Sequence, residues 1–136
     1  APSYTMNVEI TPPSFFVESN EQILGAAANT SILKNAFIEA MSDENIRLSD
    51  SKNTADYSIS IDANTTKAYV NMGQYTAGLS MRIRVSDSNK RIVYNKERDH
   101  IEGSGTNYKN ASKDAYQNAA NFIIRRSFNN IKRTIF

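Results

Sequence analysis

Two stretches in the middle of the chain alternate apolar and polar residues with a period of two. The apolar members are Ala55, Tyr57, Ile59, Ile61 and Ala63 in the first stretch and Leu79, Met81, Ile83 and Val85 in the second. This alternation gives a β-strand one apolar and one polar face. Antiparallel sheets with one covered face have this pattern, whereas buried parallel strands are apolar throughout. The sequence therefore predicts an antiparallel sheet whose apolar face is covered.

Two further stretches repeat apolar residues at the three- and four-residue spacing of an amphipathic helix. After Thr30, a candidate N-cap, come Ile32, Leu33, Ala36, Phe37, Ala40 and Met41. Between about residues 111 and 133 the stripe consists of Ala111, Ala115, Ala119, Phe122, Ile123 and Ile131. We therefore predict an α/β (α+β) two-layer sandwich, an antiparallel sheet of about 4–5 strands with two helices packed on one face.

The N-terminal part has weaker patterns. Residues 4–10 predict a short strand, which the prolines at 12 and 13 interrupt because proline lacks the N–H that a central strand needs. Phe15 and Phe16 belong to a second short strand, where they either enter the core or form a patch for a partner. Residues 21–29 are either a helical turn or a loop. We expect residues 1–136 to form a single domain, with 1–20 partly extended.

The residues around the long strands predict turns and an edge. Ile46 to Leu48 suggest a short strand, and the alternation after Ala63 changes phase, which indicates a bulge or bend. Gly73 and Gly78 bracket a turn or an irregular crossing. The polar run 87–90 is a hairpin signal. The strand that returns from it, 92–102, ends in charged residues typical of an exposed edge, and we expect the glycines at 103 and 105 to break it.

Composition limits the class of protein. The chain has 136 residues, of which 22% are charged and 40% hydrophobic, as in globular proteins. No apolar run approaches the ~18 residues of a membrane span, so we predict no transmembrane segment. Cysteine is absent, which excludes disulfides, thiol catalysis and cysteine-bound zinc. The sequence starts at Ala1 and not at Met, so a removed leader is one interpretation and the compartment stays open.

The net charge of +2 conceals an uneven distribution. Residues 1–66 carry three basic and nine acidic side chains, whereas residues 106–136 carry six and one. A basic terminal segment is either a surface for nucleic acid or anionic lipid, or a solvated helix face whose cations favour the helix C-terminus.

The search for chemistry is mostly negative. His100 is the only histidine, and it lies among charges with no orienting partner nearby in sequence. Asp56 and Asp62 share a strand face but are about 20 Å apart, too far for a catalytic pair. The amides of 103–106 precede a helix, so they either cradle an anion or simply make a turn. We expect no enzyme, no cofactor and no metal site.

The order of elements and three local motifs resemble a family of small domains in bacterial envelope lipoproteins, the CsgG-like, TolB N-terminal-like and FlgT-like group. The motifs are "TADYSISID", the hairpin "RIRVSDSNKRIVYNK" and the terminal helix "ASKDAYQNAANFII". The family's turn is matched by Val85, Asp87, Ser88, Asn89, Lys90, Arg91, Ile92 and Val93. The likeness covers about residues 30–130. The chain lacks a clear TolB-like start and a lipidation cysteine, and no catalytic residues carry over.

The resemblance implies a non-enzymatic protein-interaction module of the cell envelope, periplasmic or outer-membrane-anchored. Such a module would be an assembly or secretion accessory lipoprotein with a protein partner in the envelope or a homo-oligomeric state. The candidate partner-binding residues are Phe15, Phe16, Arg82, Arg84 and Arg98. The alternative is a nucleic-acid-binding domain that uses the basic segment from Arg82 to Arg133.

Overall fold

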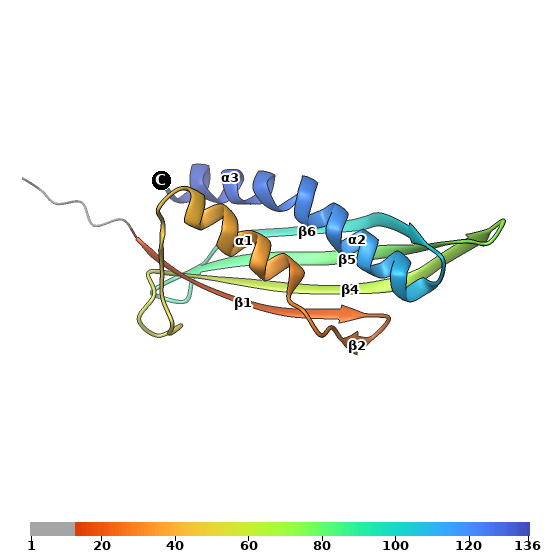
Figure 1. Cartoon of the computed structure of the whole chain (residues 1–136). Coiled ribbons are helices and arrows are strands. Elements are labelled where there is room, and N and C mark those ends of the chain that lie inside the picture. The colour runs from red at the N-terminus through yellow and green to blue at the C-terminus, as the bar shows by residue number, and fades with distance from the viewer. Residues whose placement is uncertain (1–12) are drawn as a thin grey trace, which may run out of the picture.

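The computed structural model describes residues 13–136 as a six-stranded sheet with its helices on one face (Figure 1). The strands are β1 (Ser14–Ile23), β2 (Ala26–Ala27), β3 (Arg47–Leu48), β4 (Tyr57–Asn71), β5 (Gln74–Asp87) and β6 (Ile92–Gly105). The helices are α1 (Ile32–Asp43), α2 (Tyr108–Phe122) and α3 (Ile124–Ile135). The strand predicted at residues 4–10 lies outside the described residues.

The sheet is mixed, which corrects the predicted antiparallel sheet of 4–5 strands with two helices. Its order is β2-β1-β4-β5-β6, with β3 also beside β1. β1 runs parallel to both β3 and β4, and the other pairs are antiparallel. The parallel pair arises because α1 carries the chain back along the sheet between β1 and β4, as in a crossover connection. Residues 14–23 form one ten-residue strand, which includes the predicted second short strand and the first part of residues 21–29, where the sequence predicts a helical turn or a loop.

The apolar face of the alternating runs is buried as predicted. Ile59 on β4 is the register partner of Val85, and Ile83 on β5 is the register partner of Ile61; the exposed fractions of Ile59 and Ile83 are 0% and 1%. They pack in one cluster with Phe37 and Met41 of α1 and Phe128 of α3. Burial of each large aliphatic side chain contributes about 1.5–3 kcal/mol. Burial of this apolar face therefore explains why the helices pack on this side of the sheet.

The glycines of β6 bring α2 close to the sheet; they do not break the strand, which continues to Gly105. A Cβ atom on Gly103 would lie 2.1 Å from the backbone nitrogen of Ala115. A Cβ on Gly105 would lie 2.8 Å from the backbone nitrogen of Ala111. The prediction of a broken strand is therefore wrong, because these glycines serve the close approach of two backbones.

The predicted terminal helix is two helices, which meet at Ile123. The buried stripe of α2 runs through Ala115 and Ala119, and the next buried position is Ile124, five residues later. A straight helix would turn that stripe away from the sheet, so the break at Ile123 keeps both helices facing the core. Phe122, predicted to point inward, is 67% exposed.

The first turn of α1 is capped from the sheet. Ser31, and not the predicted Thr30, occupies the N-cap, and its side chain makes no capping hydrogen bond. Instead, the carboxylate of Glu21 on β1 accepts hydrogen bonds from the backbone N–H groups of Leu33, at 2.7 Å, and Lys34, at 3.3 Å. A buried carboxylate at this end also interacts favourably with the helix dipole.

The turns agree largely with the sequence. Asp87 accepts hydrogen bonds from the backbone N–H groups of Asn89 and Arg91, which closes the predicted hairpin at 87–90. The β4–β5 hairpin turns at Met72 and Gly73, both with positive φ, whereas Gly78 lies inside β5. The register of β4 shifts between residues 67 and 69, slightly later than the predicted bulge.

Candidate functional site: the open face of the sheet

The face of the sheet opposite the helices is uncovered and polar. The polar members of the alternating runs form rows across the strands, because directly paired residues point to the same side. One row crosses four strands and consists of Asn20, Asp62, Arg82 and Glu97. The next row consists of Glu18, Ser60, Arg84 and Asn95. We call these two rows and the residues beside them the open face.

The first row contains a matched pair of charges. The Arg82 guanidinium donates to the Glu97 carboxylate on the neighbouring strand, and Asp62 is the register partner of Arg82 on the other side. An open groove of about 330 Å³ passes over this row, and Asn64, Ser80 and Asp99 also line it. The exposed ion pair contributes little stability, on the order of 0–1 kcal/mol, so its main effect is to fix the orientation of Arg82.

Arg84, unlike Arg82, has no carboxylate partner among the described residues. None of the ion pairs among residues 13–136 includes Arg84. Its Nε atom is buried and has no hydrogen-bond partner among the described residues. The polar residues directly beside it on β4 and β6 are the neutral Ser60 and Asn95. Arg84 is therefore a half-buried cation on a rigid strand that no described carboxylate neutralises.

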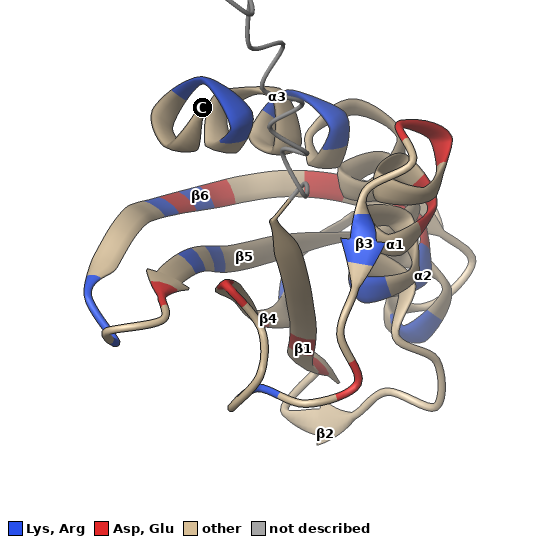
Figure 2. Cartoon of the chain, turned by 90° about the vertical axis from the view of Figure 1, so that its left-hand side faces the viewer, with Lys and Arg blue, Asp and Glu red and all other residues tan. Residues whose placement is uncertain are grey.

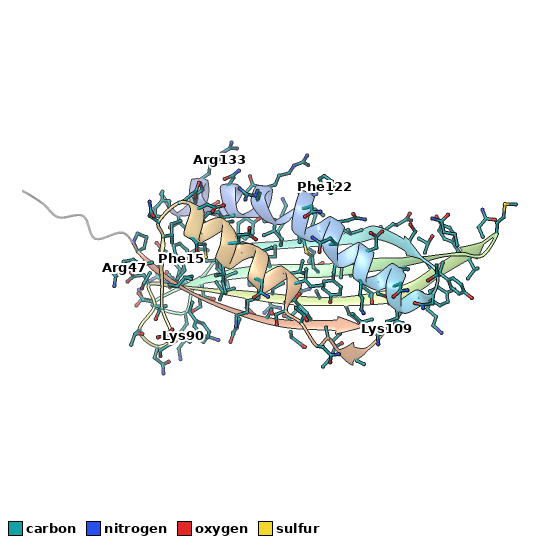
Figure 3. The ribbon with its side chains drawn as sticks, viewed as in Figure 1. Phe15, Arg47, Lys90, Lys109, Phe122 and Arg133 are labelled. Carbon is teal, nitrogen blue, oxygen red and sulfur yellow. The ribbon has the colours of Figure 1, made fainter. Side chains whose placement is uncertain are left out.

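The structure separates the other predicted site residues. Phe15 is fully buried and its ring stacks on that of Tyr57, with 5.4 Å between centroids, so it belongs to the core and not to a surface patch (Figure 3). Phe16 is half-buried on the open face, two strands away from Arg84. Arg98 is exposed on β6 as the register partner of the core residue Met81, which places it on the helix side of the edge.

The charged residues beside Arg82 were not singled out from the sequence. The sequence predicts only that Glu97 is one of the charged residues of an edge strand and that Asp62 is too far from Asp56 for a catalytic pair. The polar phase of the period-two pattern was a signal for both residues. Their position beside Arg82, however, depends on the strand order and register, which period two leaves open.

Several polar groups that could take part in catalysis or ligand binding make hydrogen bonds within the protein instead. Asp56 accepts a hydrogen bond of 2.8 Å from the backbone N–H of Ser14, which ties the start of β4 to β1. The amide of Ser104, part of the candidate anion cradle, donates to Asp114 at 2.9 Å. The N-terminus of α2 is capped by the Asn107 side chain. Within residues 13–136 no three acidic or histidine side chains are arranged to hold a metal ion.

The basic residues of the C-terminal half do not form one surface. Arg82 and Arg84 lie on the open face, whereas the basic residues of α3 lie in the helical layer on the other side of the sheet (Figure 2). A nucleic-acid surface that runs from Arg82 to Arg133 would need both sides of the molecule. That alternative stays a hypothesis, and no described surface gathers its residues.

Comparison with known proteins gives the fold. No protein-family model and no curated protein match the sequence. A minor lipoprotein from Acinetobacter baumannii shares the fold over 90% of this chain and 91% of that chain, with a TM-score of 0.53 and 16% identity. The uncharacterised lipoprotein B from Nitrosomonas europaea matches over 86% of this chain and 83% of that chain, with a TM-score of 0.50 and 11% identity.

These likenesses show that the chain has a fold found in bacterial lipoproteins. The finer resemblance to the CsgG-like, TolB N-terminal-like and FlgT-like group stays a prediction. In the part of the chain that the structure describes, each helix is too short or too polar to cross a bilayer.

Proposed function

We propose that the chain is a non-enzymatic module of the bacterial cell envelope that binds a protein partner through the open face of its sheet. The fold shared with bacterial lipoproteins supports an envelope location, periplasmic or outer-membrane-anchored. The resemblance to the CsgG-like, TolB N-terminal-like and FlgT-like group supports the role of an accessory lipoprotein in assembly or secretion.

The observation that carries this proposal is the position of Arg84. Arg84 is half-buried and has no carboxylate beside it among the described residues, so its charge loses part of its hydration. A carboxylate of the bound protein would compensate for that loss of free energy. Arg84 is held on a long strand between β4 and β6, so its backbone is already ordered before a partner binds. Little conformational entropy is then lost on binding.

The chemistry of the open face indicates the kind of partner. Ser60 and Asn95 flank Arg84 and can donate or accept hydrogen bonds. Half-buried Phe16 supplies an apolar contact on the same face. We therefore expect a partner surface with an acidic side chain for Arg84 surrounded by polar groups, and with an apolar contact toward β1.

Site-specific photo-crosslinking in the producing bacterium tests the proposal. A photoreactive residue at Ser60, on the open face, should crosslink to one defined envelope protein, whereas the same residue at exposed Ser42 on α1 should not. Arg84→Glu should abolish the crosslink from position 60, and Arg84→Lys should retain part of it because the positive charge remains. The absence of any crosslink from position 60, or an identical pattern from position 42, would contradict the proposal.

A further inference from the structure

A stripe of two phenylalanines and two arginines runs along the outer side of the helical layer, opposite the buried side of α3. Phe122 and Phe136 are 67% and 65% exposed. Arg126 and Arg133 are also exposed and lie between them. Arg126, Asn129 and Arg133 follow one another in steps of three and four residues, which puts these side chains on one side of α3; Phe122 is the last residue of α2, just before α3, and Phe136 directly follows α3. We call this set the outer stripe.

The outer stripe is directed away from the core. The buried residues of α3 are Ile124, Ser127, Phe128 and Ile131, on the opposite side of the helix. Figure 3 shows Phe122 and Arg133 both projecting from the side of the helices that faces away from the sheet. The stripe is about 20 Å long at 1.5 Å per residue, and it therefore spans several lipid headgroups.

The charged side chains of α3 that form no ion pair within the described residues are all positive. α3 contains no acidic residue, as its colouring in Figure 2 shows. Arg125 pairs with Asp43 at 3.1 Å and Lys132 pairs with Glu44, both at the C-terminal end of α1. Arg126 and Arg133 take part in no ion pair among residues 13–136. Glu39 of α1 also takes part in no ion pair among these residues, and it lines the groove between α1 and α2.

We propose that the outer stripe docks the protein reversibly on an anionic phospholipid surface. The arginines would lie against the headgroup phosphates, and the two phenylalanines would enter the boundary between headgroups and acyl chains, as aromatic and basic residues do in interfacial helices. The inference does not rest on the proposed function. The open face lies on the opposite side of the molecule, so a partner and a membrane can be engaged together.

The shape of the surface favours a lipid surface over an acidic protein or a nucleic acid. None of five hollows on the described surface is lined by Phe122, Arg126, Arg133 or Phe136. A fluid headgroup layer adapts to a convex helix, whereas a specific protein interface needs complementary pockets for its anchoring side chains. Two unpaired arginines are fewer than the roughly 6–10 phosphate contacts of a typical DNA-binding surface.

Tryptophan fluorescence tests the proposal directly, because the chain contains no tryptophan. Phe122→Trp introduces a single reporter in the outer stripe. With phosphatidylglycerol vesicles at low salt its emission should shift to the blue and be quenched by brominated lipid, and phosphatidylcholine vesicles should cause neither change. Met72→Trp, at the fully exposed tip of the β4–β5 hairpin, is the control and should keep its emission.

Vesicle co-sedimentation measures the part played by the arginines. Arg126→Gln with Arg133→Gln should lower the partition coefficient about 25-fold, since each arginine near an anionic surface contributes roughly fivefold. Lys90→Gln with Arg91→Gln removes the same charge at the exposed β5–β6 turn and should change it little. Circular dichroism confirms that both variants fold.

Four results would overturn the proposal. These are no sedimentation with phosphatidylglycerol vesicles at low salt, equal binding to phosphatidylcholine, equal losses in the two double variants, and a blue shift at position 72 but not at position 122. Binding of polyglutamate or of a single-stranded oligonucleotide as tightly as the vesicles, with no blue shift of the Phe122→Trp variant on the vesicles, would also overturn it in favour of an acidic protein or a nucleic acid.

Discussion

The hydroxyl of Tyr116 on α2 donates a hydrogen bond of 2.6 Å to the backbone carbonyl of Gln22 at the end of β1, 94 residues away in the sequence. The residue before Gln22 is Glu21, whose carboxylate caps α1. One small region therefore joins a strand of the sheet to the start of α1 and the middle of α2. Its buried polar groups satisfy one another, and this makes the region sensitive to substitution.

Tyr116 should make stability depend on pH in the alkaline range. Burial raises the pKa of Tyr116 above its ordinary value, and the neighbouring Glu21 carboxylate raises it further. In the unfolded state the tyrosine loses its proton at a pH of about 10, whereas the raised pKa means that the folded state holds the proton up to a higher pH. The stabilisation is fully present below about pH 10 and is lost as the pH rises through the folded pKa. Denaturant unfolding as a function of pH should show this loss.

Tyr116→Phe is the matched variant for that experiment. It should lower the free energy of unfolding at pH 7 by about 1 kcal/mol, since the Gln22 carbonyl loses its donor. It should also remove the part of the alkaline loss that comes from Tyr116, so the two proteins converge in stability above about pH 10. Parallel curves over the alkaline range would contradict the assignment.

Replacement of Glu21 should destabilise the start of α1. Glu21→Leu leaves the backbone N–H groups of Leu33 and Lys34 without their acceptor, and we expect a loss of about 1–3 kcal/mol in the free energy of unfolding. Amide hydrogen exchange should accelerate at Leu33 and Lys34. Glu18→Leu on the same strand, where the carboxylate is exposed and pairs with Lys52, should cost less than about 1 kcal/mol.

Gly103 and Gly78 form a contrasting pair of glycines. Gly103→Ala should cost about 3 kcal/mol or more, because the new methyl group would lie 2.1 Å from the backbone of α2 and the helix would have to move. Gly78→Ala places its methyl group where no heavy atom lies within 4 Å. That variant should be neutral or slightly more stable, and thermal unfolding of both proteins makes the comparison. Equal effects would mean that α2 does not lie directly on β6.

His100 occupies a strained position at the edge of the sheet. Its φ is 59°, and the register of β6 against β5 shifts around it, which marks a β-bulge. Glycine adopts positive φ without a Cβ penalty, so His100→Gly should raise the free energy of unfolding by about 0.5–1 kcal/mol. His100→Val should lower it by a similar amount or more, because a β-branched side chain disfavours this conformation. Chemical denaturation of the three proteins checks the order.

The covered face of the sheet could be predicted because it depends on local spacing alone. Ile59 and Ile83 alternate with polar neighbours, and burial of one face follows from that period wherever the strand pairs. Phe15 could not be assigned in the same way. The strand that carries Phe15 contains few apolar residues, so its pattern does not mark one face. Only the β1–α1–β4 crossover shows that Phe15 points into the core.

Some errors came from residues whose role is defined by a distant segment. Gly103 has the pattern of a strand breaker in the sequence, but its function is set by α2 lying against it. Glu21 is a charged residue in the core phase of β1, which was a usable signal of a buried partner. The identity of that partner, the N-terminus of α1, depends on how the helix returns to the sheet.

The sequence by itself determined which residues alternate, which form amphipathic helices and where the hairpin at Asp87 turns, because these properties follow from the spacing of neighbours along the chain. Tertiary structure decided the parallel pairing of β1 with β4, the row that places Asp62 and Glu97 beside Arg82, and the unpaired position of Arg84. These depend on strand order and register, which contacts between distant segments fix.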